Sequence, residues 1–374
     1  MIISLYLIIL SFLTVFSYRF IDDNFPLTLP PYIHDFTHLE RSITTIIFIV
    51  ILFFMFTGFT ILWRQVVQKR ISTIKLKYLI TFTVIILIFA YPAFSNDIFN
   101  YMATARVSYF YQENPYIMMP IEFIGEPMLK FMHAANKIAL YGPIWIGLTF
   151  LPFLTGLGNI ILTLISFKIF ITLFYVGIIC LIWKLSNHNL SSLVFFSLNP
   201  LVLIETLISS HNDIVMMFFV LFSLLLIKKY KVFALFMFLF SILIKYSTIT
   251  LIPIYLYILW KNIKKQKIDW ENIYLYAAIL MFLTMLIVAP LREEIYPWYG
   301  IWFLTFLSLV PKIELQFLSL VFSLGLLLRY VPFMLWGTYF GPTPVAKTIL
   351  MITPIGLMLF LHIFRKLWLK KFLR

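Results

Sequence analysis

Charged residues are scarce in this sequence and cysteine is almost absent, and these shortages exclude two common classes of protein. Charged residues make up 12% of the 374 residues, whereas soluble domains contain about 25%. Cys180 is the single cysteine, so one chain can form neither a disulfide framework nor a cysteine-based metal site. The sequence also shows no clear internal repeat and no low-complexity linker. An ordinary soluble domain and a disulfide-rich domain are therefore both excluded.

Apolar side chains dominate instead. Hydrophobic residues reach 62% of the chain, and the mean hydropathy is +0.99. A globular core cannot hide this much apolar surface, so part of it must face lipid. Backbone groups in hydrocarbon must be hydrogen-bonded within their own segment, and the apolar runs are continuous and of helix length. The composition therefore predicts an all-α integral membrane protein, with residues 1–374 forming a single polytopic domain.

Basic residues outnumber acidic residues by 29 to 15, and most of them gather between apolar runs. Four basic clusters lie at residues 64–77, 228–231, 261–267 and 365–374. Cytoplasmic loops of membrane proteins carry such an excess of Lys and Arg, which also suits an anionic inner leaflet. In a soluble protein the same net charge of +14 would suggest nucleic acid. Here we expect membrane lipids as a partner and no nucleic acid.

The apolar runs and the basic clusters together predict a topology. The candidate membrane spans are residues 1–17, 43–63, 78–94, 159–183, 190–208, 214–228, 272–290, 299–311, 315–331 and 346–364. The first run lacks a basic segment and a cleavage site, so we interpret it as a retained span rather than a signal peptide. With the basic clusters inside, both termini are cytoplasmic. The outward loops are then residues 18–42, 95–158, 209–213, 291–298 and 332–345.

Two apolar segments do not fit this topology as simple crossings. Residues 143–155 would spoil the parity, so we expect them to dip into the membrane or lie at its surface. Residues 232–260 have a basic cluster at each end, which favours two half-helices that meet near Lys245. Broken helices of this kind are tolerated where they line a cavity. The loop 95–158 is expected to carry helices that lie at the interface, with Tyr and Phe at headgroup level.

In this topology, polar residues that are distant in sequence come to the outward side of the membrane. These residues are Asp97, Arg106, Glu205, His211, Asn212, Asp213, Lys245, Arg292, Glu293, Glu294, Tyr296, Trp298 and Tyr299. A carboxylate at a cavity can act as general base toward a hydroxyl, and cations can stabilise a phosphate leaving group. Aromatic rings can stack on the apolar face of a sugar. The combination predicts a membrane glycosyltransferase site that accepts a lipid-phosphate-sugar donor from the membrane.

Each of these elements also has a structural interpretation. Asp97 could be a hydrated loop residue, and Arg106 could contact lipid headgroups. The turn 211–213 could be ordinary turn chemistry, and the stretch 296–299 could belong to an aromatic belt. Lys245 is the exception, because a lysine inside a long apolar run needs a partner, water or an escape to the interface.

Five stretches, taken in order, resemble the GT-C superfamily of polyprenyl-phosphate-sugar-dependent glycosyltransferases. They are "SNDIFNYMATARVSYFYQENPY" (95–116), "YGPIW" (141–145), "NPLVLIETLISSHNDIVMM" (199–217), "SILIKYSTITLIPIYL" (241–256) and "YPWYGIWFL" (296–304). The chain is most similar to bacterial and archaeal α-mannosyltransferases that use polyprenyl-phosphate-mannose. The resemblance covers roughly residues 78–310. It implies a GT-C-type bundle of about 10–13 transmembrane or membrane-dipping helices, although some of the candidate spans are short for a membrane of about 30 Å.

The resemblance also implies roles for individual residues. Asp97 matches the catalytic acid and would deprotonate the acceptor hydroxyl. The expected contacts to donor phosphate or substrate are Arg106, His211, Asn212, Asp213, Lys245, Tyr296, Trp298 and Tyr299. Many GT-C enzymes carry an Asp-X-Asp or Glu-X-Asp motif in the first loop, whereas the local sequence here, Ser95-Asn96-Asp97, has one acid only. A divalent metal would want several oxygen ligands, so no metal and no cofactor are expected.

The expected reaction is transfer with inversion of a sugar, by preference mannose, from a polyprenyl-phosphate donor to a lipid or glycan hydroxyl. It would take place on the extracytoplasmic face of the cell membrane. The alternative is a transporter or flippase of lipid-linked sugars, since transporters also use broken helices and intramembrane charges. The missing repeat and the gathering of charges on one side disfavour it. A polymerase or ligase that uses a pyrophosphate-linked donor is a further alternative, disfavoured by the early position of the large loop.

Overall fold

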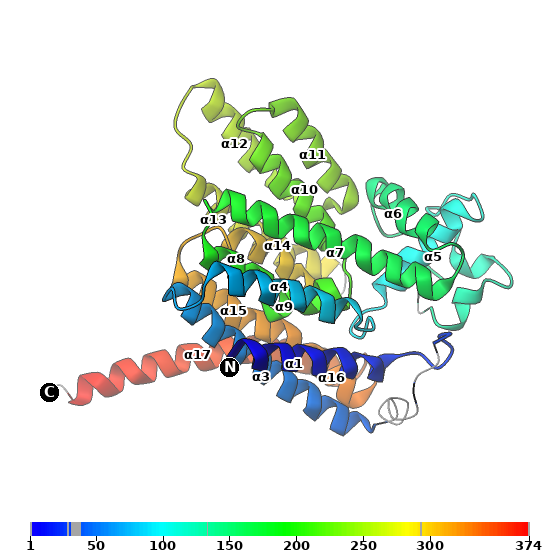
Figure 1. Cartoon of the computed structure of the whole chain (residues 1–374), viewed down its shortest axis with the longest axis horizontal. Helices are drawn as coiled ribbons and strands as arrows, with labels where there is room; N and C mark the ends of the chain where they lie inside the picture. The colour runs from blue at the N-terminus through cyan, green and yellow to red at the C-terminus, as the bar shows by residue number, and fades with distance from the viewer. Residues whose placement is uncertain (1, 28–29, 31–38, 133, 292–293, 373–374) are drawn as a thin grey trace.

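The computed structural model describes residues 2–27, 30, 39–132, 134–291 and 294–372 (Figure 1). Helices account for 75% of the structure, and the described residues contain no strand. The prediction of an all-α protein is therefore confirmed. The α-helices are α1 (Ile2–Ser17), α3 (Arg41–Val67), α4 (Thr73–Ile88), α5 (Asp97–Tyr109), α6 (Pro143–Thr155), α7 (Ile160–Leu185), α8 (Leu190–Ser197), α9 (Pro200–Leu203), α10 (Asp213–Leu226), α11 (Lys231–Ile244), α12 (Ile252–Ile263), α13 (Trp270–Leu291), α14 (Gly300–Leu307), α15 (Ile313–Leu328), α16 (Tyr330–Trp336) and α17 (Thr343–Phe372).

Short turns of other helical types connect several of these helices. The 3-10 turns are η1 (Tyr18–Phe20), η2 (Pro120–Glu122), η3 (Pro127–Lys130), η5 (Tyr246–Leu251) and η6 (Pro297–Tyr299), and η4 (Ile204–Ile208) is π-helical. Side-chain caps fix the starts of four helices: Ser72 for α4, Asn159 for α7, Asn189 for α8 and Asn199 for α9. Each cap accepts a backbone N–H bond from two or three residues later, which satisfies a donor that the helix itself leaves free.

Six of the described helical segments are long and apolar enough to cross a membrane. They are Ile2–Phe20, Arg41–Val67, Ile160–Leu185, Trp270–Ala289, Ile313–Trp336 and Thr343–His362. A seventh results if the pair Leu190–Ser197 and Pro200–Ile208, bent by 51°, is one span. The spans expected at residues 78–94, 214–228 and 299–311 correspond to helices of 16, 14 and 8 residues. At 1.5 Å per residue, these are shorter than the roughly 30 Å of hydrocarbon.

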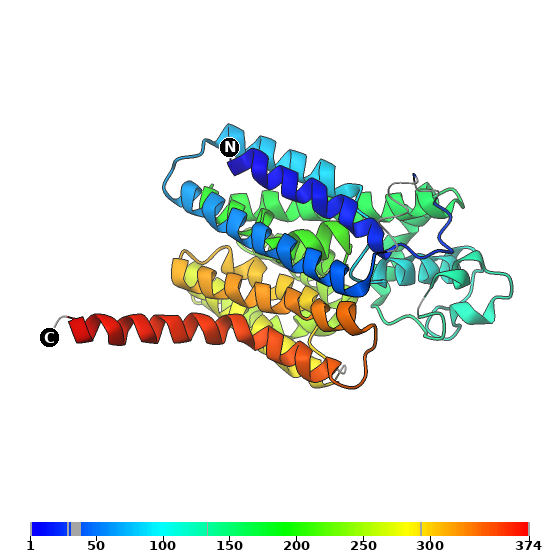
Figure 2. The same ribbon diagram turned by 90° about the horizontal axis from the view of Figure 1, so that it is seen from below.

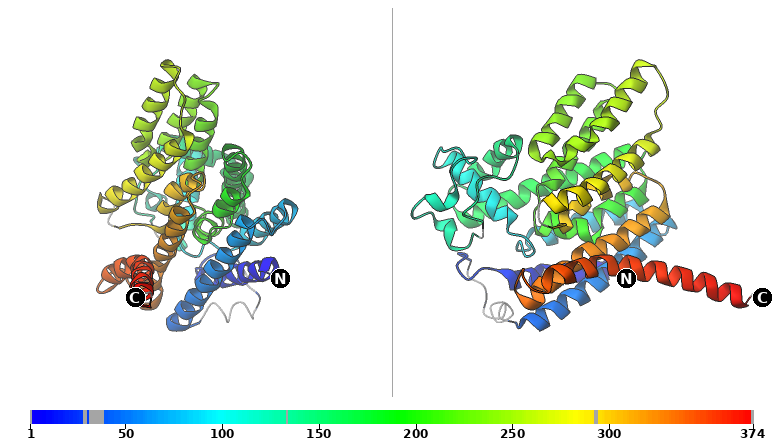
Figure 3. Two further views of the ribbon diagram at one scale, coloured as in Figure 1. Left: turned by 90° about the vertical axis from the view of Figure 1, so that its left-hand side faces the viewer. Right: turned by 180° about the vertical axis from the view of Figure 1, so that it is seen from behind.

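The helices form a bundle with one elaborated end. Figure 1 shows α5, α6 and the loops around them (cyan to green) at one end, and the C-terminal part of α17 (red) extends from the other. Seen from below, α1 and α3 lie above α15–α17, and α3 packs directly against α15 and α16, with the central helices behind them (Figure 2). The pair α11 and α12 leans out from the bundle on the side away from α17 (Figure 3).

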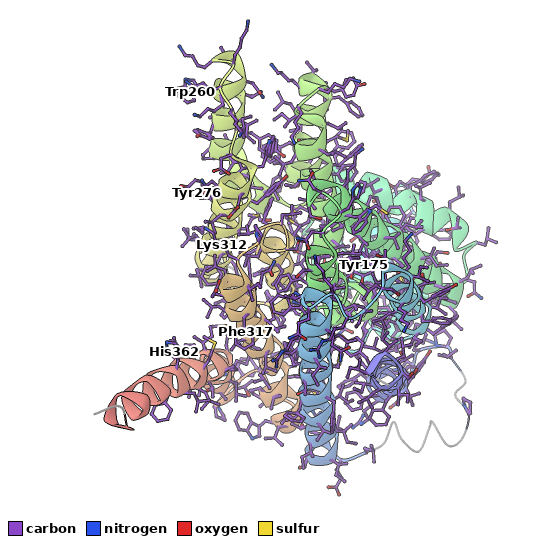
Figure 4. All side chains as sticks on the ribbon, turned by 60° about the vertical axis from the view of Figure 1, so that its left-hand side comes forward. Tyr175, Trp260, Tyr276, Lys312, Phe317 and His362 are labelled. Atoms are coloured by element: carbon purple, nitrogen blue, oxygen red, sulfur yellow. The ribbon has the colours of Figure 1, made fainter. Side chains whose placement is uncertain are left out.

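Buried apolar side chains from Tyr6 to Met351 form one continuous core. Tyr175 lies inside the bundle, where its hydroxyl donates to the carbonyl of Ser197 (Figure 4). Large aromatic side chains also stand on the outer surface, including Trp260 and Tyr276 (Figure 4). An outside rich in apolar residues is expected for helices that face lipid rather than water. The chain is thus a multi-pass membrane protein.

The segment 232–260 breaks at Lys245. Helix α11 ends at Ile244, Lys245 itself is extended, and η5 begins at Tyr246. Phe238 of α11 stacks on Tyr255 of α12 with ring centroids 3.7 Å apart, so the two helices fold back against each other. The break turns the Lys245 side chain toward α10 rather than leaving it within an uninterrupted apolar helix.

Candidate active site

Asp97 begins α5, at the end of the bundle that carries the large loop. Helix α4 ends at Ile88, and the short linker that follows brings the chain to Ser95, whose hydroxyl accepts the backbone N–H of Asp97 at 3.2 Å. The Asp97 side chain is 24% exposed, unlike the buried residues that follow it on α5. Its position leaves one face of the carboxylate open to solvent and the other directed at the protein interior.

The π-helical turn η4 carries the second part of the site. It leads into the sequence Ser209–Asp213, all of which is fully buried. Ser210 adopts a left-handed backbone conformation with φ of 59°, which is uncommon for a residue other than glycine. The hydroxyl of Tyr101 on α5 accepts the backbone N–H of Asn212 at 3.2 Å. This tight turn brings His211 beside α5.

His211 lies between two carboxylates. Its Nδ1 atom is 3.3 Å from Oδ2 of Asp97, and its Nε2 atom is 3.3 Å from Oε2 of Glu205. The hydroxyl of Tyr330 donates to both oxygens of Glu205, at 3.0 and 3.2 Å. The imidazole also stacks on Trp298, with ring centroids 4.0 Å apart. The chain Asp97–His211–Glu205–Tyr330 therefore fixes the orientation of the Asp97 carboxylate.

The charge of His211 follows from this environment. Burial is the largest influence and lowers the pKa of His211, but contacts with the Asp97 and Glu205 carboxylates outweigh it and raise the pKa to about 9. His211 is therefore an imidazolium at neutral pH. A buried cation held by two carboxylates has little freedom to bind another anion.

Lys245 is paired in a similar way. Its Nζ atom lies 2.9 Å from each carboxylate oxygen of Asp213. The indole N–H of Trp302 donates to the same carboxylate, and the ammonium group lies 5.5 Å from the ring centroid of Tyr299. Asp213 is the partner that a lysine in an apolar run requires. Sequence reasoning predicted both residues at the site but not their mutual pairing.

A cavity of about 390 Å³ brings together five of the nine residues predicted to act in catalysis or substrate binding, and we refer to it as the Asp97 cavity. Its lining residues are Asp97, Asn100, Ala134, Lys137, Leu140, Tyr141, Lys245, Tyr296, Trp298 and Tyr299. The rings of Tyr296 and Trp298 stack face to face with centroids 4.4 Å apart, and we call this stacked pair the aromatic wall. His211 and Asp213 are fully buried and are not among the residues that line the cavity. They pair with Asp97 and Lys245, which do line it.

At one side of this cavity, the backbone at Gly142 packs closely against the backbone at the end of α11. The N–H of Gly142 donates to the carbonyl of Ile244 at 3.1 Å, directly before the break at Lys245. A Cβ atom at Gly142 would lie 2.0 Å from the carbonyl oxygen of Leu243, so only glycine fits. The large loop is thereby attached to the end of α11.

Arg106 is not among the residues that line the cavity. Its Nη2 atom is 2.8 Å from Oε2 of Glu126, which also accepts a hydrogen bond from Tyr111 at 2.8 Å. The position of Glu126 beside α5 could not be predicted, because the loop between them has no regular period. The predicted contact of Arg106 with substrate stays a prediction. Arg292 and Glu293, also expected near the site, lie outside the described residues.

Lys168 is a site residue that sequence reasoning missed. Its buried ammonium donates to the carbonyls of Ala90, Leu207 and Ile208, the last two at 2.9 and 3.4 Å. These carbonyls belong to the segment that leads to Asp97 and to the end of η4. Lys168 lies inside the apolar run 159–183, just as Lys245 lies inside 232–260. A charged residue inside an apolar run was therefore the feature by which Lys168 could have been predicted.

Other polar groups near the turn have no hydrogen-bond partner in the part of the chain that is described. They include both side-chain polar atoms of Asn212 and the hydroxyls of Ser209 and Ser210. Within the same described ranges, no group of three or more His, Cys, Asp or Glu side chains is arranged to hold a metal ion.

Comparison with known protein families identifies one match. The family model described as "Alpha-(1->6)-mannopyranosyltransferase, N-terminal domain", of the MptA_B family, matches residues 13–261, about two-thirds of the chain. The matched range includes Asp97, His211 and Lys245, whereas the aromatic wall and α15–α17 lie beyond it. No curated protein and no solved structure matches the chain.

Proposed function

Because the chain belongs to the MptA_B family of alpha-(1->6)-mannopyranosyltransferases, a GT-C mannosyltransferase family, we propose that it transfers mannose from a polyprenyl-phosphate-linked donor. The acceptor is a hydroxyl of a lipid or glycan. The observation that carries this proposal is the Asp97 carboxylate. It is oriented by His211 yet partly exposed, and it lines a cavity with Lys245 and an aromatic wall.

In the proposed reaction Asp97 accepts the proton of the acceptor hydroxyl. The hydroxyl oxygen then forms a bond to the anomeric carbon of mannose, and the bond from that carbon to the phosphate oxygen breaks. Polyprenyl phosphate leaves with the bonding electrons, and no covalent enzyme intermediate is needed. Direct displacement inverts the anomeric centre, so a β-linked donor gives an α-linked product. General base catalysis of this kind contributes about 10²–10⁴ to the rate.

The neighbours of Asp97 support this role. His211 and Glu205 hold the carboxylate in one orientation, which keeps it ready to accept a proton. The rings of Tyr296 and Trp298 offer a surface for the apolar face of a sugar. Lys245 lines the same cavity but is paired with Asp213, so its contact with the donor phosphate stays a prediction. Direct substrate contacts by Asn212 and Asp213 remain predictions, since both are fully buried.

We also propose that the Asp97 cavity opens on the extracytoplasmic face and that both termini are cytoplasmic. Helix α4 runs from the basic loop at Lys69 and Arg70 to the segment that precedes Asp97, so the cavity and this basic loop lie at opposite ends of one helix. The positive-inside rule then supports an outward cavity. The whole chain acts as one membrane domain, with the segment 95–158 covering the site.

The orientation can be tested by labelling. Cys180 is first replaced by Ala, and single cysteines are then introduced at the exposed positions Ile124 and Lys265. A membrane-impermeant maleimide applied to intact cells should label Ile124→Cys and leave Lys265→Cys unlabelled until the cells are opened. The reverse pattern would place the site in the cytoplasm.

The activity can be tested with purified protein in lipid nanodiscs. Polyprenyl-phosphate-mannose should be consumed in the presence of a lipid or glycan acceptor, and glucose, galactose or arabinose donors should be consumed more slowly. Asp97→Asn should lower kcat by about 10³-fold, within the range of general base catalysis. A flippase would instead consume no donor, and its Asp97→Asn variant would still move lipid between the leaflets of a vesicle.

A further inference from the structure

A second cavity lies beside the first and shares its aromatic wall. It has a volume of about 220 Å³, and Tyr296 and Trp298 line both cavities. Asn96 lines this second cavity, whereas the next residue, Asp97, lines the first. Tyr330, the hydrogen-bond donor to Glu205, lines the second cavity as well. The two cavities are therefore neighbours that meet at the start of α5.

Among the described residues that line this second cavity, the charged groups are two cations and one carboxylate. Nη2 of Arg329 is 3.0 Å from Oε2 of Glu294, and Nζ of Lys347 lies 3.0 and 2.9 Å from the two oxygens of the same carboxylate. The side chains of Arg329 and Lys347 are 6% and 10% exposed, whereas Glu294 is 27% exposed. One carboxylate balances only one of the two cations.

An unbalanced cation in a buried place favours an anionic ligand. Burying a charge without a counter-charge is unfavourable, and the guanidinium fork of Arg matches phosphate oxygens. Arg329 follows α15 and Lys347 lies on α17, and both belong to candidate membrane spans. Phe94, Phe333 and Met334 add apolar surface to the cavity. Such a site fits a phosphate at the end of an apolar chain better than a free, fully hydrated anion.

We infer that Arg329 and Lys347 bind the phosphate of the lipid-linked donor, and that this phosphate competes with Glu294 for the two cations. The identity of the donor rests on the proposed function. With the phosphate at these cations, the sugar extends past the aromatic wall toward Asp97. Lys245 and His211 are less suited to bind the phosphate, because neither has to share a carboxylate with another cation, whereas Arg329 and Lys347 share Glu294. Glu294, the most exposed of the three, is the group that moves aside.

The test measures binding of a polyprenyl monophosphate without sugar to the full chain in nanodiscs of zwitterionic lipid. Arg329→Gln and Lys347→Gln should each weaken binding about 10-fold, since each removes a charge-assisted hydrogen bond. Glu294→Gln should strengthen binding by roughly threefold, because it removes the competing carboxylate. Lys312→Gln, at an exposed lysine elsewhere, is the matched control and should leave binding unchanged.

Opposite signs of effect distinguish a binding site from a purely structural ion network. If Glu294→Gln weakened binding as much as the two cation variants, the inference would be overturned. The double variant Glu294→Gln with Arg329→Gln leaves no unpaired carboxylate, so it guards against a folding defect. It should bind at least about 10-fold more weakly than Glu294→Gln alone. Equal binding by these two variants would also overturn the inference.

Competition assays distinguish the donor from other sources of phosphate. Transfer assays distinguish a failure of this inference from a failure of the proposed function. Inorganic phosphate and phosphatidylglycerol should compete poorly with the polyprenyl monophosphate; equal competition by either would overturn assignment to the donor. In transfer assays, Lys347→Gln should raise KM for the donor about 10-fold with little change in kcat. Transfer with unchanged KM would refute this inference alone. If polyprenyl monophosphate bound through both Arg329 and Lys347 but the wild type transferred no mannose, the proposed function alone would be refuted.

Discussion

The two neighbouring cavities differ in the balance of their charged groups. Around the Asp97 cavity, three carboxylates meet three cations: Asp97, Glu205 and Asp213 pair with His211 and Lys245, and the exposed Lys137 also lines the cavity. In the second cavity, two cations meet one carboxylate. The first arrangement suits a base that accepts a proton, and the second suits an anion that arrives from outside. We therefore interpret the two cavities as the two halves of one site. The Asp97 cavity would accept the proton, and the second cavity would bind the phosphate.

After Asp97→Asn itself, the largest effect should come from loss of the His211 imidazolium. His211→Gln removes the cation that orients Asp97 and leaves Glu205 buried without it, so kcat should fall by about 100-fold. Binding of polyprenyl monophosphate in the second cavity should change by less than about twofold. Steady-state transfer and equilibrium binding in nanodiscs measure the two quantities. His188→Gln, at an exposed position, is the control. If kcat were unchanged in His211→Gln, the assignment of proton transfer to the Asp97 cavity would be wrong.

A smaller effect is expected at Lys168. Lys168→Met leaves the carbonyls of Ala90, Leu207 and Ile208 without their donor, at about 1–3 kcal/mol for each group left unsatisfied. The variant should therefore melt at a lower temperature, and kcat should fall by about 10-fold as the Asp97 and His211 segments lose their shared anchor. Lys184→Met, on the exposed end of α7, serves as the control. A loss of phosphate binding without a loss of kcat would contradict this account.

The smallest effect concerns pH. The pKa of His211 is raised to about 9 in the folded protein, above its ordinary value of 6.5. The stabilisation from the imidazolium is therefore complete below about pH 6.5 and is lost as the pH rises through about 9. The apparent melting temperature of the wild type should fall by a few degrees between pH 7 and pH 9.5. His211→Gln should show a flatter profile, and an equally steep one would assign the change to other groups.

The sequence was sufficient to predict the all-helical class and several members of the Asp97 cavity. Asp97, Lys245 and the Tyr296–Tyr299 stretch stood out because polar or aromatic groups interrupt apolar runs at predicted outward ends. The same reasoning applies to Lys168, but its run was treated as an ordinary span. Pairing could not be predicted, because the contact of Arg106 with Glu126 depends on how an irregular loop folds.

The second cavity lay beyond sequence reasoning for a different reason. Arg329 and Lys347 sit at the ends of apolar runs, where basic residues are common at membrane boundaries. Only the packing of α16 against α17 and the approach of Glu294 turn these boundary residues into a buried cluster. Helix length was also difficult to predict: the apolar run 214–228 corresponds to α10, a helix of 14 residues whose side chains are mostly buried inside the bundle.

Parallel measurement of kcat and of the dissociation constant for polyprenyl monophosphate in Asp97→Asn and Lys347→Gln tests the division between the two cavities most directly. We predict that Asp97→Asn loses about 10³-fold in kcat and binds the lipid phosphate normally. Lys347→Gln should keep its kcat at saturating donor and bind the lipid phosphate about 10-fold more weakly. If both variants instead altered the same parameter to a similar extent, the proposed separation of base and phosphate site would be wrong.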